Sequence, residues 1–335
     1  MVLGMFKLEA DLDLISLGRA AMDFYPEKFN APIYESTRFK FSLGGSPGNT
    51  AIGAAKLGLR TGFIGRLTDD MLGQYLMRRL EADGINTEGI VIDRSGAQSG
   101  LAFVEIRSPS DCGLVMYREN AVDLRLEPAD ISSDYIRGAK ALLVSGTALS
   151  RSPSREAALL ALEYARNHDV VTIMDIDYRP YSWVSPDETS IYLSLAAAKC
   201  NIIIGTREEF DVLDAIRGCS GDDRQVISRW FKEAAQIIII KFGMNGSTAY
   251  LADGSEHTAE VFPVEAKMTN GAGDAYSAGL LYGLIKDLGI ARSMEVASAS
   301  AALNLLGDDC SYAMPTLEQV RQFLAERGRT ETLTP

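Results

Sequence analysis

The chain has 335 residues, enough for one large domain or two smaller ones, and its 47% hydrophobic and 23% charged content is typical of a globular protein. A net charge of −12 argues against binding to nucleic acid or to an anionic membrane surface, since both call for basic patches. No apolar run approaches 18 residues, so no membrane-spanning helix is expected.

The predicted elements begin with a buried strand over 13–18, a helix over 48–57, a strand over 63–65 and a helix over 70–82. From residue 140 onwards, strands and helices alternate along the chain. The strands cover 141–145, 170–175, 201–204 and 236–241, and the helices cover 154–167, 188–198 and 208–216. Strands that are apolar throughout are typical of a parallel sheet covered by helices on both faces. We therefore predict a three-layer α/β/α sandwich with a mostly parallel central sheet.

Two stretches interrupt this alternation, residues 31–43 and about 89–122. They contain β-prone segments such as 101–106 and 113–117 and carry no helix signal. Neither stretch is long enough to be a stable domain. Together they predict a small antiparallel sheet that projects from the main domain as a lid, although the pattern alone fits a pair of edge hairpins equally well.

Cysteine and histidine show no pattern typical of a catalytic or metal centre. The four cysteines are widely spaced and include no CxxC pair: Cys112, Cys200, Cys219 and Cys310. With only two histidines in the chain, a Ser-His-Asp machine or a histidine metal site is not expected. The first 14 residues have acidic side chains and no long apolar core, so we expect no secretory signal and a cytoplasmic protein with reduced thiols.

A glycine-rich corner, residues 269–274, joins a strand-like run to an Ala/Gly/Leu-rich helix predicted over 275–286. Small residues before a helix let main-chain N–H groups converge on an anion, and Asp274 adds a carboxylate beside them. This combination suits phosphoryl transfer. An acidic residue in a first helical turn often only favours the helix dipole, so the corner alone does not decide the function. The chain has no Walker A motif, and Tyr276 stands where a dinucleotide fingerprint needs a small residue.

Three further clusters accompany the corner. They are the double glycine and asparagine within 44–51, the Thr-Arg-Glu-Glu run over 206–209, and the loop 241–246 that closes an apolar strand. Their order and spacing resemble the ribokinase-like (PfkB) family of small-molecule kinases over nearly the whole chain. This resemblance implies a ribokinase-like fold, a kinase domain over 11–330 with the lid inserted in it, and the use of ATP and Mg²⁺.

The resemblance also implies roles for individual residues. Asp274 would be the catalytic base, and the amides of Gly271, Ala272 and Gly273 would form the anion hole. The sugar would be held by Asp23, the Gly44–Gly45 turn and Asn49. ATP would be bordered by Lys241, Gly243, Gly246, Thr206 and Asn304. Glu209 would organise water around magnesium.

Two departures from the family pattern stand out. Thr206 occupies a position where the family usually has asparagine, which weakens the magnesium assignment. Residues 268–270 lack the usual Asp-Thr-Thr pattern, which weakens any expectation of a monovalent cation.

A narrower resemblance, over 17–26, 116–123 and 175–183, points to members of the family that act on a keto-deoxy sugar acid of inositol catabolism. It implies transfer of phosphate from ATP to the primary hydroxyl of 5-dehydro-2-deoxy-D-gluconate. An acid substrate suits arginine, which pairs with carboxylates in a bidentate manner. The candidates near the substrate are Arg19, Tyr117, Arg118 and Arg179, and Arg179 could equally brace its loop or touch phosphate.

Several alternatives stay open at this point. They are a kinase of 2-dehydro-3-deoxygluconate, a fructokinase or ribokinase, and a silent sugar-binding regulator on the same fold. On the favoured reading Asp274 has a low pKa, stays ionised at neutral pH and takes the hydroxyl proton. The expected partners are an acid sugar, ATP and a second copy of the chain bound through the lid.

Overall fold

The structure is a computed structural model that describes residues 4–109, 111–218 and 221–329, so Cys219 and residue 330 lie outside it. The strands are β1 (Leu12–Leu17), β2 (Ala21–Pro26), β3 (Phe39–Gly44), β4 (Thr61–Thr68), β5 (Asn86–Asp93), β6 (Leu101–Ser108), β7 (Asp111–Tyr117), β8 (Ala139–Ser145), β9 (Val171–Asp175), β10 (Ile202–Thr206), β11 (Ile237–Lys241), β12 (Ser247–Leu251) and β13 (Glu256–Ala259). The helices are α1 (Ser46–Lys56), α2 (Met71–Ala82), α3 (Ser133–Arg137), α4 (Ser154–Asn167), α5 (Pro186–Ala197), α6 (Arg207–Leu213), α7 (Asp223–Trp230), α8 (Ala272–Ile285), α9 (Ile290–Leu305) and α10 (Leu317–Ala325).

The large sheet has the order β13-β12-β11-β10-β9-β8-β1-β4-β5 among the described residues. The strands from β11 to β5 pair in parallel, and β12 and β13 add an antiparallel edge. From β1 the chain builds outwards first to β4 and β5, and later in the opposite direction through β8 to β11. Ligands of open α/β sheets bind beyond the carboxyl ends of the strands near such a reversal of strand order.

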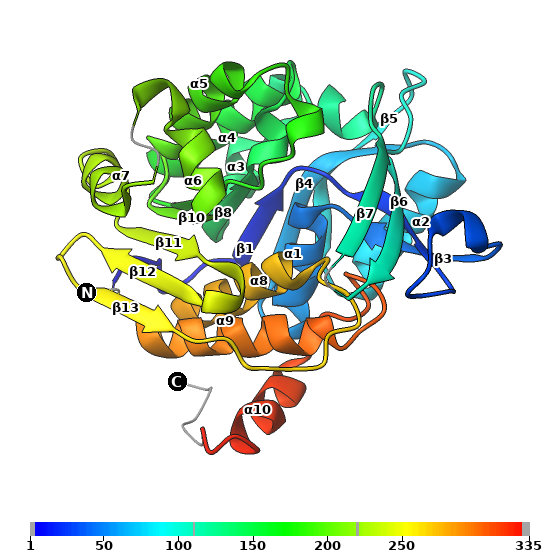
Figure 1. The fold of residues 1–335 in the computed structure, drawn as a ribbon. Helices are drawn as coiled ribbons and strands as arrows, with labels where there is room; N and C mark the ends of the chain where they lie inside the picture. The colour runs from blue at the N-terminus through cyan, green and yellow to red at the C-terminus, as the bar shows by residue number, and fades with distance from the viewer. Residues whose placement is uncertain (1–3, 110, 219–220, 330–335) are drawn as a thin grey trace.

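Helices cover both faces of this sheet (Figure 1), and the side chains of each strand alternate between the two layers. On β1, Ile15 and Leu17 join the core beneath α3 to α7, whereas Leu14 joins the core beneath α8 to α10. Helices α1 and α2 pack on the same side as α8, in a third cluster that includes Phe63 of β4. Both faces of the central strands are therefore buried, which explains their apolar sequences and confirms the predicted sandwich.

The small sheet has the order β3-β2-β6-β7 and lies at one side of the large sheet (Figure 1). Its bounds differ from the expectation in two ways. Residues 89–93 belong to β5 at the edge of the large sheet, and Ala21–Pro26 joins the small sheet as β2. The sheet is also mixed rather than antiparallel, because β2 pairs in parallel with β6.

The two faces of this small sheet, which we call the lid, differ in chemistry because successive residues of a strand point to opposite sides. On β2, Asp23 and Tyr25 lie on one face and Phe24 on the other. Tyr25 packs against Met268 and Cys310, which flank the base of the glycine corner, so this inner face lies over the site. The outer face is aromatic and includes Phe24, Phe39, Phe41, Phe103 and Tyr117.

Candidate active site

The glycine corner forms the start of α8, which begins three residues earlier than predicted, at Ala272. Gly271 precedes it with φ of 90°, a conformation that favours glycine, and a Cβ there would lie 2.9 Å from both Asn304 Oδ1 and Cys310 Sγ. No side chain caps this helix start, although its first amides have no acceptor within the helix. The amides of Gly271, Ala272 and Gly273 are thus donors available to an anion, and their role as the anion hole stays a prediction.

Asp274 lies in the first turn of α8, beside the amides, with part of its surface exposed. Asn49 Nδ2, from α1, donates a hydrogen bond of 2.8 Å to Asp274 Oδ2. Burial, together with the charge of Asp177, raises the pKa of Asp274 to about 7, against the opposing effects of Asn49, Ser46 and Arg179. The expectation of a low pKa was wrong, because the helix start does not outweigh desolvation and a second carboxylate nearby.

Lys241, the last residue of β11, extends toward the same helix start. Its ammonium lies 3.9 Å from the position that a Cβ on Gly273 would take and 3.7 Å from Asp175 Oδ1. Burial alone would lower the pKa of Lys241, but Asp175, Glu209 and Asp274 raise it above its usual value. A cation therefore lies next to the amides at the start of α8, and contact between Lys241 and ATP stays a prediction.

The glycine pair after β3 lies against Asp23. A Cβ on Gly44 would lie 2.0 Å from the carboxyl carbon of Asp23, so only glycine leaves room for this side chain. Gly45 has φ of 95°, and its Cβ would lie 2.5 Å from the carbonyl oxygen of Arg19. Burial raises the pKa of Asp23 to about 6, although Arg19 and the Tyr25 hydroxyl, which donates to Asp23 Oδ2 at 3.2 Å, favour its charged form.

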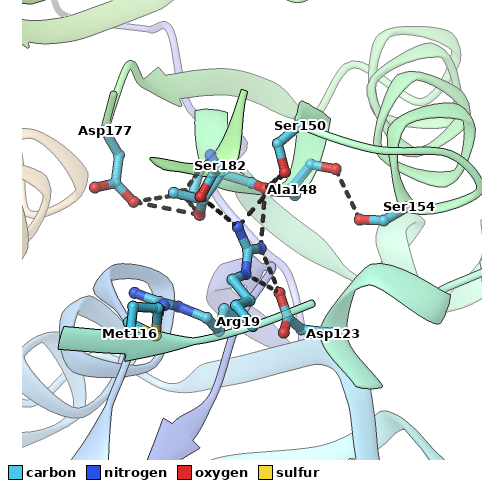
Figure 2. Close-up of polar contacts among 11 residues, drawn as sticks. Arg19, Met116, Asp123, Ala148, Ser150, Ser154, Asp177 and Ser182 are labelled. Carbon is cyan, nitrogen blue, oxygen red and sulfur yellow. Dashed lines mark hydrogen bonds and ion pairs between the residues drawn. The ribbon is translucent and has the colours of Figure 1, made fainter. Parts of the chain in front are cut away.

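Arg118 follows β7 and is buried, with every N–H of its guanidinium facing an acceptor. It donates to Asp123 from both Nε and Nη2, to the carbonyl oxygen of Thr147 at 3.1 Å, and to the hydroxyls of Ser182 at 3.0 Å and Ser150 at 3.5 Å. Figure 2 shows how three of these partners lie, Asp123, Ser150 and Ser182. A substrate carboxylate would have to displace these partners, so Arg118 is not a substrate ligand in this structure, contrary to the expectation.

The neighbouring residue, Tyr117, is 64% exposed on the outer face of the lid, where its ring meets the edge of Phe103. The register of β6 and β7 sets this orientation, because Tyr117, the last residue of β7, is directly opposite Leu101 on the face that also includes Phe103. The side chain thus lies on the face of the lid opposite to Asp23, and a contact between Tyr117 and the substrate stays a prediction.

Comparison with known proteins agrees with this arrangement. Residues 11–317 match the model of the pfkB family carbohydrate kinases. The chain belongs to this family. It is 49% identical over 321 residues to the 5-dehydro-2-deoxygluconokinase of Geobacillus kaustophilus, with 96% of each chain covered. It is 48% identical to 5-dehydro-2-deoxygluconokinase 2 of Bacillus cereus, which covers 95% of this chain and 96% of the relative.

Solved structures share the fold of this pfkB family kinase. Fructokinase from Xylella fastidiosa, crystallised with ATP, superposes with a TM-score of 0.84 at 22% identity over 94% of this chain and 99% of its own. A putative ribokinase II from E. coli in complex with ATP and magnesium gives the same TM-score at 20% identity, covering 94% and 99%. The predicted ribokinase-like fold is confirmed.

The loop after β11, which the resemblance placed beside ATP, has the shape that its glycines predict. Gly243 and Gly246 have φ of 57° and 83°, and a Cβ on Gly246 would lie 2.1 Å from the carbonyl oxygen of Ala259. Asn304, expected near the adenine, is fully buried instead. Its Nδ2 donates to the carbonyl oxygen of Cys310 at 3.0 Å and its Oδ1 lies beneath Gly271, so it supports the corner from within.

Thr206 and Glu209 form a capping box at the start of α6. The Thr206 hydroxyl accepts from the Glu209 amide at 3.2 Å, and Glu209 Oε2 accepts from the Thr206 amide at 2.8 Å. Glu209 Oε1 accepts from the amide of Tyr178 at 2.9 Å, which ties the loop after β9 to α6. Each carboxylate oxygen keeps a second lone pair, so Glu209 can still accept a hydrogen bond from water. Within the described ranges, no group of three acidic, cysteine or histidine side chains is placed to bind a metal directly.

Sequence reasoning missed Asp177, which follows β9 in an unusual backbone conformation with φ of 40°. It accepts from the Ser145 hydroxyl at 2.7 Å, pairs with Arg179 Nη2 at 2.7 Å and raises the pKa of Asp274. The signal was present, because the residue comes two positions after a buried parallel strand, where side chains reach the site. Arg179 keeps 40% of its side-chain surface exposed and so retains access to a ligand.

In the part of the chain that the structure describes, no helix has the length and apolar character needed to cross a membrane.

Proposed function

We propose that this kinase transfers the γ-phosphoryl group of ATP to the primary hydroxyl of 5-dehydro-2-deoxy-D-gluconate. The products would be ADP and 6-phospho-5-dehydro-2-deoxy-D-gluconate, as in inositol catabolism. The observation that carries the proposal is the position of Asp274, held by Asn49 beside the uncapped start of α8. The names of relatives that are 48–49% identical over nearly the whole chain support the choice of substrate.

In the reaction, the substrate hydroxyl lies between Asp274 and the γ-phosphate. Its oxygen forms the new P–O bond as the bond to the bridging oxygen of ADP breaks, and its proton passes to the Asp274 carboxylate. A pKa near 7 makes Asp274 a stronger base than an ordinary carboxylate and leaves a large fraction ionised at neutral pH. The amides at 271–273 and the Lys241 ammonium stabilise the charge on the phosphate oxygens.

Asp23 and Asn49 are placed to bind the other hydroxyls of the sugar. Asp23 accepts only from Tyr25 among the hydrogen bonds of the described residues, and Asn49 Oδ1 is buried with no partner there. A buried polar atom without a partner is costly, so both oxygens favour hydroxyl donors from a ligand. Magnesium, bound with the nucleotide, would neutralise charge on the phosphate oxygens, and Glu209 fits a contact with one of its waters.

Release of ADP, measured with a panel of sugars, tests the proposal. We expect rapid release with 5-dehydro-2-deoxy-D-gluconate and at most slow release with 2-dehydro-3-deoxygluconate, fructose or ribose. The variant Asp274→Asn should lose at least about 10²–10³ in kcat. Asp187→Asn is the matched control, since it removes an exposed carboxylate from the first turn of α5. A faster reaction with a neutral sugar would refute the substrate, and binding of sugars without any ADP release would favour a silent regulator.

We also propose that two copies associate through the lid in the cytoplasm, where ATP is available. The outer face of the lid leaves several large apolar side chains in solvent, among them Phe41 at 48%, Val115 at 54% and Tyr117 at 64% exposure. An exposed apolar patch of this kind is typical of an interaction surface. Sedimentation of the wild type against Phe41→Asp tests this, with a monomeric wild type as the contrary result.

A further inference from the structure

Arg19 differs from every other cation of the site in having no acidic partner. It is only 6% exposed, yet among the described residues no carboxylate lies within ion-pair distance of it. Its one polar contact is from Nη1 to the thioether sulfur of Met116, at 3.4 Å, and its Nε is buried with no partner. Figure 2 shows Arg19 beside Met116. A buried guanidinium with this many uncommitted donors is costly unless a ligand completes it.

The location of Arg19 places it within the substrate side of the site. It follows β1 at the reversal of strand order, and its Cγ would lie 3.3 Å from a Cβ on Gly45. Burial opposes its charge, but Tyr181, Asp123, Asp23 and Asp177 are near enough to raise its pKa. Asp23 is the proposed ligand of a sugar hydroxyl, and Asp177 acts on the Asp274 base. A molecule held by Asp23 and Asp274 is therefore within reach of the Arg19 guanidinium.

The free donors of Arg19 are on one edge of its guanidinium. Nη1 faces Met116, so Nε and Nη2 remain, and these two nitrogens form the side-on edge that binds both oxygens of a carboxylate. Hydroxyl groups of a neutral sugar could accept from these nitrogens, but only a carboxylate would add a negative charge in direct contact with the guanidinium. These two donors and the nearby Asp23 thus favour a ligand that has one carboxylate in addition to its hydroxyls.

We propose that Arg19 binds the carboxylate of the sugar acid through Nε and Nη2 and thereby sets the preference of this kinase for acid sugars over neutral ones. This inference rests on the proposed function, because it assumes that the acceptor is a sugar acid. It assigns to Arg19 the role that the sequence allowed for either Arg19 or Arg118, since Arg118 has no donor to spare.

The experiment compares kcat/KM for the sugar acid and for its C1 amide, a neutral analogue of nearly the same shape. We expect the wild type to prefer the acid by on the order of 10²–10³, the effect of two charge-assisted hydrogen bonds in a buried site. Arg19→Met should remove this preference by lowering kcat/KM for the acid while changing that for the amide only a few-fold. Arg19→Lys should retain part of it, since a lysine keeps the charge but loses the fork.

Arg107→Met is the matched control, because it removes a half-exposed lid arginine whose partners, Glu105 and Asp111, lie on the lid itself. It should leave the preference for the acid unchanged. Equilibrium binding of the acid and the amide, measured by calorimetry without nucleotide, should show the same preference and the same loss in Arg19→Met. This second measurement keeps the test valid for a variant that folds but turns over slowly.

Different outcomes separate the two proposals. A wild type that uses acid and amide equally well, or an Arg19→Met variant that keeps the full preference, overturns the role of Arg19 and leaves the phosphorylation of the sugar acid intact. Loss of the preference in Arg118→Lys with full retention in Arg19→Met also overturns it. A wild type that phosphorylates only neutral sugars overturns the proposed function, and the inference with it. If Arg19→Met does not fold, the preference for the acid over the amide is compared between the wild type and Arg19→Lys, and an equal preference in both proteins overturns the role of Arg19.

Discussion

Asp274→Asn should inactivate the kinase and at the same time stabilise its fold at alkaline pH. The substitution keeps the size of the side chain, and the asparagine oxygen can still accept from Asn49 Nδ2. It removes a negative charge that burial and Asp177 disfavour in the absence of ligands. The group that we propose as the catalytic base is thus a source of instability in the free protein, as is common for active sites.

The magnitude follows from the pKa of Asp274. In an unfolded chain this pKa is 3.8, and in the folded protein it is about 7. Between these pH values the folded protein keeps a proton on Asp274 that the unfolded chain has released. The protonated Asp274 therefore contributes a stability that is fully present below about pH 4 and lost as the pH rises through 7. At about 1.4 kcal/mol per pH unit the loss reaches about 4 kcal/mol at pH 8, an upper limit for a side chain that is partly exposed.

Urea unfolding, followed by the fluorescence of Trp183 and Trp230, measures this effect at several pH values. We expect Asp274→Asn to exceed the wild type by about 2–4 kcal/mol at pH 8. The difference should shrink steadily toward zero near pH 4. A variant that is no more stable than the wild type at pH 8, or a gain that does not change with pH, would refute the reasoning about the burial of Asp274.

Three further predictions concern the same site. The kcat/KM of the wild type should rise with pH up to about 7 and then level off, because Asp274 must be ionised to accept a proton. Asp177→Asn should move this rise to lower pH, because it removes a charge that raises the pKa of Asp274. A kcat/KM that does not change from pH 5 to 8 would contradict this prediction. Arg118→Met should cost about 3–5 kcal/mol in urea unfolding, since it leaves a buried carboxylate unpaired, and a loss below about 1 kcal/mol would show that this network is not structural. Gly44→Ala should raise the KM for the sugar at least about tenfold and leave the KM for ATP unchanged, because the added Cβ would displace the Asp23 carboxylate. Equal KM values for the sugar in the wild type and in Gly44→Ala would exclude a contact between Asp23 and the sugar.

The parts of the fold and site that could be predicted depend on local patterns. Strands such as Ile237–Lys241 are buried on both faces, and their continuous apolar sequence already indicates a covered parallel sheet. The corner before Asp274 is defined by glycines within four residues of each other, so its backbone geometry is a property of the local sequence. Residues at the carboxyl ends of parallel strands, such as Lys241, meet at the site for the same reason.

The parts that could not be predicted depend on residues far apart in the chain. Arg118 is neutralised by Asp123 nearby, but its remaining donors are taken by Thr147 and Ser182, whose distance from it is set by the whole sheet. The pKa of Asp274 likewise depends on Asp177, which is nearly one hundred residues away in sequence. Burial and contacts between residues that are distant in sequence arise only in the folded structure. The local motif at the start of a helix therefore does not predict them.

The alternation of side chains along β2 limits how this kinase can change in evolution. Asp23 and Phe24 are adjacent in the chain, yet Asp23 lies on the inner face of the lid and Phe24 on the aromatic outer face. Insertion or deletion of a single residue within Ala21–Pro26 would exchange the two, placing a phenyl ring against the substrate and a carboxylate among the aromatics. This strand can therefore vary by substitution but not in length, and sugar recognition and surface chemistry are inherited together.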